Sequence, residues 1–228
     1  MIASIGKQTV TAEVDMKKKY RMLENDTLPL ANGKKLYRIE SLIDFSNVKA
    51  GDIGGYIRGE PNLSHDGNAW VYGDAQVSGD AQVSGNARVY GDAWVYGDAW
   101  VSGNARVYGD AQVYGNARVH GDAQVSGNAQ VYGNARVYGD AWVSGNARVY
   151  GDALIHNKND CVWFSNVGTE SGTLTAFKNR NGDLMLTRGC FTGTVDEFLN
   201  KSAVVHDERV HREYKLLCEV AKSRILNK

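Results

Sequence analysis

The most regular feature of the chain is a six-residue alternation of apolar and polar positions between residues 67 and 156. Fifteen consecutive hexads follow the pattern Gly-(Asp/Asn)-Ala-x-Val-x without an insertion, and only the last replaces valine, with Ile155. Alanine and valine lie two residues apart, so in an extended chain they point to one side while the variable residues point to the other. The pattern therefore predicts short strands that bury alanine and valine and expose the variable side chains.

Each hexad also carries the signal for a corner. Glycine followed by aspartate or asparagine is the pair best able to adopt positive φ or a tight turn. A strand-and-corner unit repeated without helices stacks as a β-solenoid, in which each coil pairs with its neighbours through parallel backbone ladders. Three hexads make a triangular coil of 18 residues, so the fifteen hexads predict five coils. At about 4.8 Å per coil, the prism is roughly 24 Å tall.

The segment before the repeat does not follow the six-residue pattern. Strand-like runs lie at Tyr20–Leu23 and Lys35–Ile39. The glycine-punctuated run at 51–57 then indicates an irregular first coil, which Ile57 and Leu63 continue into the repeat.

The segment after the repeat mixes strands and helices. Three strands are expected at 161–167, 172–177 and 183–187, the last two joined by a turn at 179–182. Thr194 and Glu197 have the spacing of a capping box that opens one helix, and a longer amphipathic helix is expected at about 207–226.

The sequence thus predicts a mainly β protein in three parts. Residues 1–54 form an N-terminal β cap, residues 55–156 the solenoid, and residues 157–228 a C-terminal α+β module with three strands and two helices. A solenoid exposes unpaired backbone at both ends, so the flanking parts are expected to act as caps.

The repeat resembles the hexapeptide-repeat, transferase-hexapeptide-like family, whose fold is the left-handed parallel β-helix. The resemblance covers residues 67–156 and implies a left-handed coil, an exception to the right-handed crossover rule that spacing alone does not give. The phrases GDIGGYI before the repeat, and WFSNVGTESGTLTAF and TRGCFTGTVDEF after it, also resemble flanks of phage and prophage members of that family. This second resemblance implies a phage-encoded protein of the host cytoplasm.

The composition excludes several further classes of protein. Among 228 residues, 43% are hydrophobic, and 26 Lys and Arg balance 26 Asp and Glu. The zero net charge argues against strong binding to duplex DNA. No run of about 18 apolar residues occurs, and residues 1–19 lack the apolar core of a signal peptide, so we expect a cytoplasmic protein without membrane contact. Cys161, Cys190 and Cys218 lack metal-ligand spacing and are expected to be buried, reduced thiols.

The 18-residue period assigns the variable side chains to three faces, and twelve of the 22 aromatic residues point outward, among them Trp70. Exposed aromatic surface on this scale usually marks an interface. The predicted binding residues are Tyr72, Arg88, Tyr90, Arg106 and Tyr108 on the first face, Trp94, Tyr96, Tyr114 and Tyr132 on the second, and Trp100, Arg118 and Arg136 on the third.

Three interpretations of these columns stay open. Stacked tyrosines stabilise a strand ladder, and duplication of near-identical hexads copies them without selection for binding. Alternatively, the first two faces pack subunits into a trimer or dimer. Finally, arginine beside tyrosine and tryptophan suits stacking on bases and contact with phosphate. We hypothesise a non-enzymatic binding scaffold without a cofactor that self-associates or binds a host macromolecule or nucleotide, and antagonism of host defence is a role that suits it.

The alternative is an acyltransferase. The family resemblance implies acyl transfer from acetyl-CoA or acyl-ACP in trimers, with a histidine base in a cleft between subunits. His120 is the one histidine in the middle of the repeat and is the candidate base. The absence of any loop insertion argues against a cofactor cleft. His120 and His156 are separated by about 9–10 Å of coil rise, so no shared zinc site is expected.

One further candidate lies in the C-terminal module. The run from Arg188 to Thr194 leads from a predicted strand into a helix N-terminus, where backbone N–H groups hold anions. Arg188, Gly189, Gly193 and Thr194 are therefore a candidate anion site. The alternative is an ordinary glycine-bearing turn followed by an N-cap.

Overall fold

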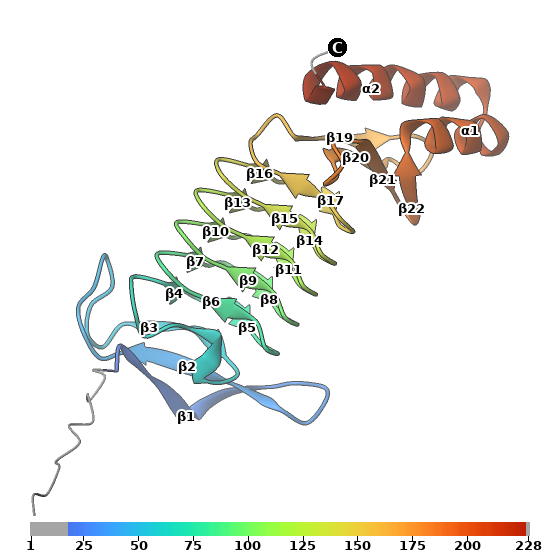
Figure 1. Ribbon diagram of the computed structural model, residues 1–228. Helices are drawn as coiled ribbons and strands as arrows, with labels where there is room; N and C mark the ends of the chain where they lie inside the picture. The colour runs from blue at the N-terminus through green and yellow to red at the C-terminus, as the bar shows by residue number, and fades with distance from the viewer. Residues whose placement is uncertain (1–17, 227–228) are drawn as a thin grey trace, which may run out of the picture.

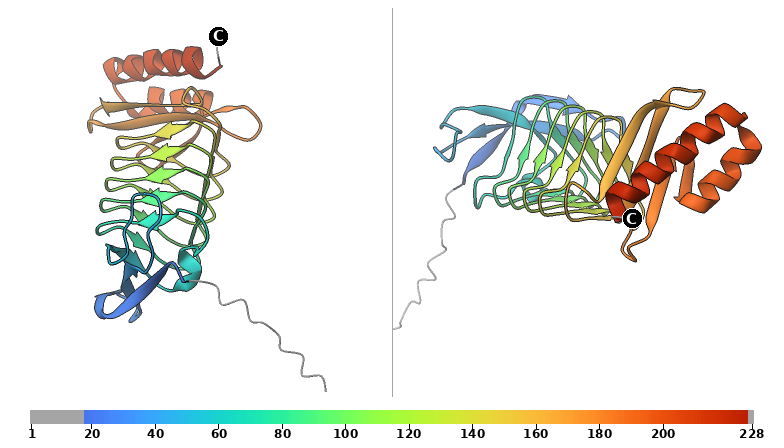
Figure 2. Two further views of the ribbon diagram at one scale, coloured as in Figure 1. Left: turned by 90° about the vertical axis from the view of Figure 1, so that its left-hand side faces the viewer. Right: turned by 90° about the horizontal axis from the view of Figure 1, so that it is seen from above.

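The computed structural model describes residues 18–226, in which the repeat forms a triangular parallel β-solenoid between two caps (Figure 1). Figure 2 shows the stacked coils from two further sides, with the helices at the end away from the N-terminal cap. Residues 1–17 of the predicted N-terminal cap and residues 227–228 of the C-terminal module lie outside the described residues. The predicted fold class is confirmed, and the left hand of the coil stays a prediction.

Each hexad contributes one strand of two residues, made by the fourth residue and the valine. The strands of the repeat are β4 (Trp70–Val71), β5 (Gln76–Val77), β6 (Gln82–Val83), β7 (Arg88–Val89), β8 (Trp94–Val95), β9 (Trp100–Val101), β10 (Arg106–Val107), β11 (Gln112–Val113), β12 (Arg118–Val119), β13 (Gln124–Val125), β14 (Gln130–Val131), β15 (Arg136–Val137), β16 (Trp142–Val143), β17 (Arg148–Val149) and β18 (Leu154–Ile155).

Every strand of the repeat pairs in parallel with the strand one coil away. Val107 of β10 is in register with Val89 and Val125, each 18 residues distant. The peptide N–H of Tyr114 donates to the carbonyl of Val131 in the next coil at 3.0 Å. The ladders form three faces: face 1 (β4, β7, β10, β13, β16), face 2 (β3, Ile53–Ile57, with β5, β8, β11, β14, β17) and face 3 (β6, β9, β12, β15, β18). The six parallel strands of face 2 give the solenoid about six turns.

Alanine and valine fill the interior as predicted. In every hexad both side chains, and Ile155 in the last, are at most 1% exposed. Ile57 and Leu63 are buried in the same core, and they pair with Val77 and Val83, which confirms the irregular first coil. Burying one valine side chain stabilises the folded state by about 1.5–3 kcal/mol, so the buried valines supply most of the stability of the repeat.

The corner glycines meet two constraints at once. Every glycine that begins a hexad has a φ between +56° and +76°, a region that L side chains rarely adopt. The next coil also passes close by: a Cβ on Gly103 would lie 2.8 Å from the backbone nitrogen of Gly121. Gly151, at the last corner, has the same kind of φ but nothing within 4 Å of such a Cβ.

The N-terminal cap extends face 2 with antiparallel strands. β1 (Tyr20–Pro29) pairs with β2 (Lys35–Ser41), β2 pairs with β3, and β3 pairs in parallel with β5. A 3-10 helix, η1 (Glu60–Asn62), precedes the first regular coil.

The cap also covers a side chain that the repeat pattern placed outside. Trp70 was expected to point outward on the first face, but it is 1% exposed and packs edge-on against Tyr20 and Phe45. The outward prediction is wrong here because the hexad period carries no information about which segment folds over the first coil.

Side chains from the cap and first coil replace the hydrogen-bond donors that a preceding coil would supply. The buried Lys19 ammonium donates to the carbonyl of Ala69 at 2.9 Å and to that of Gly67 at 3.4 Å. Arg38 donates to Gly73 at one corner. Asn62 donates to the carbonyls of Gly79 and Ala81 at the third corner. Each corner of the first coil therefore has its outward carbonyls capped by a side chain. Burial lowers the pKa of Lys19 to about 8.

The C-terminal module contains an antiparallel sheet and two helices. Its strands are β19 (Cys161–Val167), β20 (Gly172–Lys178), β21 (Leu184–Arg188) and β22 (Phe191–Thr194), and its helices are α1 (Val195–Val205) and α2 (Glu208–Leu226). The capping box at the start of α1 is confirmed. The prediction of three strands missed β22, because this glycine-containing segment is a strand only through its pairing with β21.

The module's sheet has two buried faces. Cys161 and Phe177 join the solenoid core, whereas Leu174 and Ala176 pack with the helices, as period-2 alternation along β20 requires. At the junction, the Thr175 hydroxyl accepts the N–H of Arg148 at 3.1 Å, and the Thr187 hydroxyl donates to the Arg148 carbonyl at 2.9 Å. Threonine side chains thus occupy the place of a further coil at the end of face 2.

The cysteine prediction is correct for two of three residues. Cys161 and Cys218 are buried, and burial raises the pKa of these thiols to about 12 and about 11. Cys190 is exposed because it lies in the two-residue turn between β21 and β22.

Two of the corner glycines are expected to differ in how much their replacement destabilises the protein. Gly103→Ala combines positive φ with a clash against the backbone of the next coil, whereas Gly151→Ala carries the positive φ alone. We expect Gly151→Ala to lower the free energy of unfolding by about 1–2 kcal/mol and Gly103→Ala to lower it by more. Urea unfolding followed by circular dichroism measures both, and equal losses would contradict the role of the neighbouring coil.

The capping role of Lys19 is tested against its neighbour in sequence. Lys19→Met leaves the carbonyls of Gly67 and Ala69 without their donor, and we expect a loss of about 1–3 kcal/mol in the free energy of unfolding. Lys18→Met removes an exposed ion pair with Glu60, and we expect a change of less than about 1 kcal/mol. Equal effects in urea unfolding would overturn the capping interpretation.

Candidate functional site

The columns predicted on the three faces are present, because strand register places outward side chains directly above one another. Arg106 lies between Arg88 and Gln124 on face 1, and Arg118 lies between Trp100 and Arg136 on face 3. Side chains 18 residues apart therefore act together, and the chemistry of each face depends on its column.

Face 2 carries a ladder of four parallel tyrosine rings. Tyr96, Tyr114, Tyr132 and Tyr150 stack with centroids 4.7, 4.7 and 4.6 Å apart and interplanar angles of 5°, 2° and 12°. Most ring faces are covered by the next ring, so the ladder presents ring edges and hydroxyls. Partial burial, followed by the neighbouring Tyr150 and Tyr114, raises the pKa of Tyr132 to about 12, so its phenol is neutral at physiological pH.

Within the hexads, the outward columns of face 2 carry little charge. Beside the tyrosines, the outward strand positions hold Gln76, Trp94, Gln112, Gln130 and Arg148, so Arg148 at the last coil is the one charged residue of the hexads in these two columns. Arg58 follows β3 at the other end of the face. Trp94 is 37% exposed and packs against Tyr96 with ring centroids 4.8 Å apart. The face combines aromatic surface with neutral hydrogen-bonding groups.

Face 1 contains a shallow groove that unites several predicted residues. Tyr72, Arg88, Tyr90 and Arg106 line it together with Asn47, around a volume of about 370 Å³. Tyr90 stacks on Tyr108 at 4.9 Å but meets Tyr72 edge-on at 6.5 Å, and this change of ring orientation accompanies the groove.

The arginines of this groove lack acidic partners. Among the described residues neither Arg88 nor Arg106 forms an ion pair, and Arg88 donates to the Ser46 hydroxyl at 3.3 Å. Ser46 and Asn47 belong to the N-terminal cap, and Asn47 accepts a hydrogen bond from the Tyr72 hydroxyl. Sequence reasoning missed these two residues, since no local pattern indicates that residues 46–47 fold against the repeat.

Face 3 places His120 in a smaller depression. His120, Trp100 and Arg118 line it with Ser102 and Tyr138, around a volume of about 190 Å³. The Ser102 hydroxyl and His120 Nδ1 are 2.9 Å apart and share a hydrogen bond. The Arg118 guanidinium lies 5.7 Å from the Trp100 ring centre. Arg136 follows on the same face but does not line this depression.

The four residues predicted as an anion site do not form one site. Gly193 pairs with Leu186 inside the sheet, and Thr194 is the N-cap of α1. There the Glu197 carboxylate accepts the Thr194 N–H at 2.8 Å, a hydrogen bond that holds the pKa of Glu197 below its usual value. The helix N-terminus is thus satisfied by its own carboxylate, as the turn-and-cap alternative expected.

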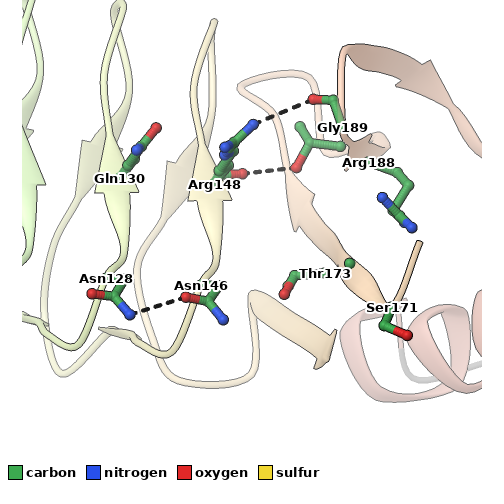
Figure 3. A pocket seen from close by; sticks show the side chains of 10 residues that line it. Asn128, Gln130, Asn146, Arg148, Ser171, Thr173, Arg188 and Gly189 are labelled. Atoms are coloured by element: carbon green, nitrogen blue, oxygen red, sulfur yellow. Dashed lines mark hydrogen bonds between the residues drawn. The ribbon is translucent and has the colours of Figure 1, made fainter. Parts of the chain in front are cut away.

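Arg188 and Gly189 instead line a pocket at the junction between the solenoid and the module. Its opposite wall is formed by Asn128, Gln130, Asn146 and Arg148 of the last two coils, as Figure 3 shows. Sequence reasoning named two of its residues but missed the pocket, because its walls come from two parts of the chain with different patterns.

The described residues contain no cluster of three or more His, Cys, Asp or Glu side chains placed to hold a metal ion. Within residues 18–226, neither helix is long and apolar enough to span a membrane.

A comparison with protein families supports the architecture. A family model described as the YdcK beta solenoid repeat matches residues 81–97, 111–127, 129–145 and 141–157. These segments lie in the solenoid or directly at its end. A search of curated proteins gave no match. The chain is a β-solenoid repeat protein, whereas the hexapeptide-repeat resemblance and the phage-like flanks stay predictions.

Proposed function

We propose that this β-solenoid repeat protein is a non-enzymatic scaffold that binds a second copy of itself through face 2. The observation that carries the proposal is the pre-stacked ladder of Tyr96, Tyr114, Tyr132 and Tyr150 on a face with a single charged side chain in its outward columns.

Self-association requires a surface that is complementary to itself. A two-fold interface brings the same patch of both copies together, so a column of like charges would repel its own image. The two arginines in the face 1 groove and the two on face 3 carry such a cost, whereas the hexads of face 2 hold Arg148 alone in their outward columns, at one end. Face 2 is therefore the best suited of the three.

The tyrosine ladder also favours binding on entropic grounds. Side chains that become ordered on association cost about 0.5–1.5 kcal/mol each, and rings already stacked in the free protein lose less. Tyrosine presents an apolar ring and a polar hydroxyl together, which is why it is enriched at interfaces.

Removal of two central rings tests the proposal. We expect the double variant Tyr114→Ala, Tyr132→Ala to lower the mass in solution from that of a dimer to that of a monomer, measured by sedimentation equilibrium. Tyr138→Ala removes an outward tyrosine from face 3 and is the matched control, with no change in mass expected. A monomeric wild-type protein, or an unchanged mass in the double variant with its circular dichroism intact, would refute the proposal.

A second candidate function is the binding of a nucleotide or a host macromolecule through the face 1 groove. Arg88 and Arg106 lie on adjacent coils without acidic partners among the described residues, in a groove that Tyr72 and Tyr90 also line, an arrangement suited to a phosphate group. A phage origin and antagonism of host defence rest on the flank resemblance alone.

An acyltransferase is the alternative, favoured by the hydrogen bond between Ser102 and His120. Under the scaffold proposal, isothermal titration calorimetry detects no acetyl-CoA binding, and His120→Ala leaves the mass in solution unchanged. Saturable acetyl-CoA binding, together with an acetyl transfer that His120→Ala abolishes and His156→Ala retains, would establish the enzyme instead.

A further inference from the structure

A separate pocket lies between the helix-facing side of the module's sheet and α1, with a volume of about 180 Å³. The Thr187 hydroxyl donates to the backbone of the last coil, and side chains alternate along a strand, so Arg188 points to the opposite side of the sheet. There it is in register with Leu174 and Phe191, which pack with the helices. In Figure 3 the Arg188 side chain accordingly points away from Arg148.

Arg188 is a largely buried cation with few acceptors. Its side chain is 11% exposed, and Nη2 donates to the carbonyl of Val167 at 3.0 Å. Its Nε is buried without a hydrogen-bond partner. The Glu170 carboxylate is 4.0 Å from Nη1, and its side chain is 83% exposed. A guanidinium has five N–H donors, and its burial with so few acceptors costs free energy unless an anion accompanies it.

A glycine on the neighbouring strand fixes the position of this guanidinium. A Cβ on Gly172 would lie 2.6 Å from Cζ of Arg188, so a larger residue there would displace the charged group. Glycine lets the guanidinium lie directly on the backbone of β20. Because the cation is held in place before a ligand binds, binding costs little side-chain entropy.

Helix α1 contributes a second cation to the pocket. Lys201 lines the same space as Arg188, and its ammonium lies 5.6 Å from the centre of the Phe191 ring. Within the described part of the chain, Lys201 forms no ion pair. Of the described residues that line the pocket, Glu170 is the only acidic one. The pocket is therefore cationic.

The rest of the lining is mainly aromatic. Phe191 packs against Phe198 with ring centroids 5.1 Å apart, and Phe198 meets Tyr214 edge-on at 4.9 Å. Val205 adds an aliphatic side chain. An apolar cavity of about 150 Å³ holds one benzene molecule, so a pocket of this size suits a single aromatic ring.

From this combination of two cations and aromatic walls we infer that the pocket binds a small aromatic carboxylate. Arg188 and Lys201 hold the carboxylate by charge-assisted hydrogen bonds, and the ring lies on Phe191 and Phe198. A carboxylate suits the pocket better than a phosphate, because Nη2 of Arg188 is already bonded to Val167 and apolar walls disfavour a dianion. The site does not involve face 2 and is independent of self-association.

Three probes test the two halves of the ligand. The full chain, in buffer free of other carboxylates, is titrated with benzoate by isothermal titration calorimetry, and we expect a Kd of about 1 mM or tighter. Benzamide has the same shape without the charge, and acetate has the charge without the ring, so both are expected to bind at least about tenfold more weakly. The mass in solution is recorded in parallel, and a monomer that binds benzoate would refute the scaffold proposal alone.

Two variants test the cations. Arg188→Gln and Lys201→Met are each expected to weaken benzoate binding by about tenfold or more, since each removes a charged donor. Lys201 is exposed, so Lys201→Met tests the site if Arg188→Gln fails to fold. Lys215→Met removes an exposed lysine of α2 outside the pocket and is the matched control, with unchanged affinity expected.

The thiol of Cys190 gives a second readout, because it is exposed and lines the pocket whereas Cys161 and Cys218 are buried. At ten times its Kd, benzoate is expected to slow modification of Cys190 by N-ethylmaleimide by up to about tenfold. Absence of benzoate binding, equal binding of benzamide, tighter binding of phenyl phosphate, an unchanged rate of modification, or an equal loss of affinity in Lys215→Met would overturn the inference.

Discussion

The structure depends on the requirement that each coil's backbone donors and acceptors find partners in the adjacent coils. Inside the repeat this requirement is met by repetition: the N–H groups of the fourth and sixth residues of a hexad reach carbonyls of the next coil, and at many corners so does that of the second residue. At the two ends the chain must supply substitutes. Lys19, Arg38 and Asn62 donate to the open carbonyls of the first coil, and the hydroxyl of Thr175 accepts an open N–H of the last. The flanks are therefore part of the ladder and not appendages, because unpaired buried backbone groups are costly.

The same stacking determines the chemistry of the outer surface. Coils about 4.8 Å apart place like side chains in contact, so tyrosines on face 2 stack on one another rather than on a ligand. Asparagines at the corners join in the same way, with Asn86 donating to Asn104 at 3.0 Å. Arginines on neighbouring coils cannot pair with each other, and in the face 1 groove their charge stays uncompensated within the described residues. The residue type that is repeated in its outward columns therefore determines the chemistry of each face.

The junction with the C-terminal module differs in shape from the periodic faces. On a face, every coil presents nearly the same environment, and the surface is flat or shallow. At the junction, the last coils meet a sheet of different geometry, and the mismatch leaves a pocket lined by residues of both. Arg188 lies on the opposite, helix-facing side of this sheet, with a single hydrogen bond to a backbone carbonyl and an exposed carboxylate 4.0 Å away.

The sequence by itself determined the period, the Ala/Val interior, the glycine corners, the three faces and the capping box of Thr194 and Glu197, because each of these follows from neighbours within a few residues or from exact repetition. The tertiary structure alone decided that Trp70 is buried, that residues 191–194 form a strand, and that Asn47 completes the face 1 groove. It also decided that Arg188, in register with Leu174, lies on the helix-facing side of the module's sheet. In each case the outcome depends on which distant segment lies against the residue, and a local pattern of polar and apolar positions does not encode that contact.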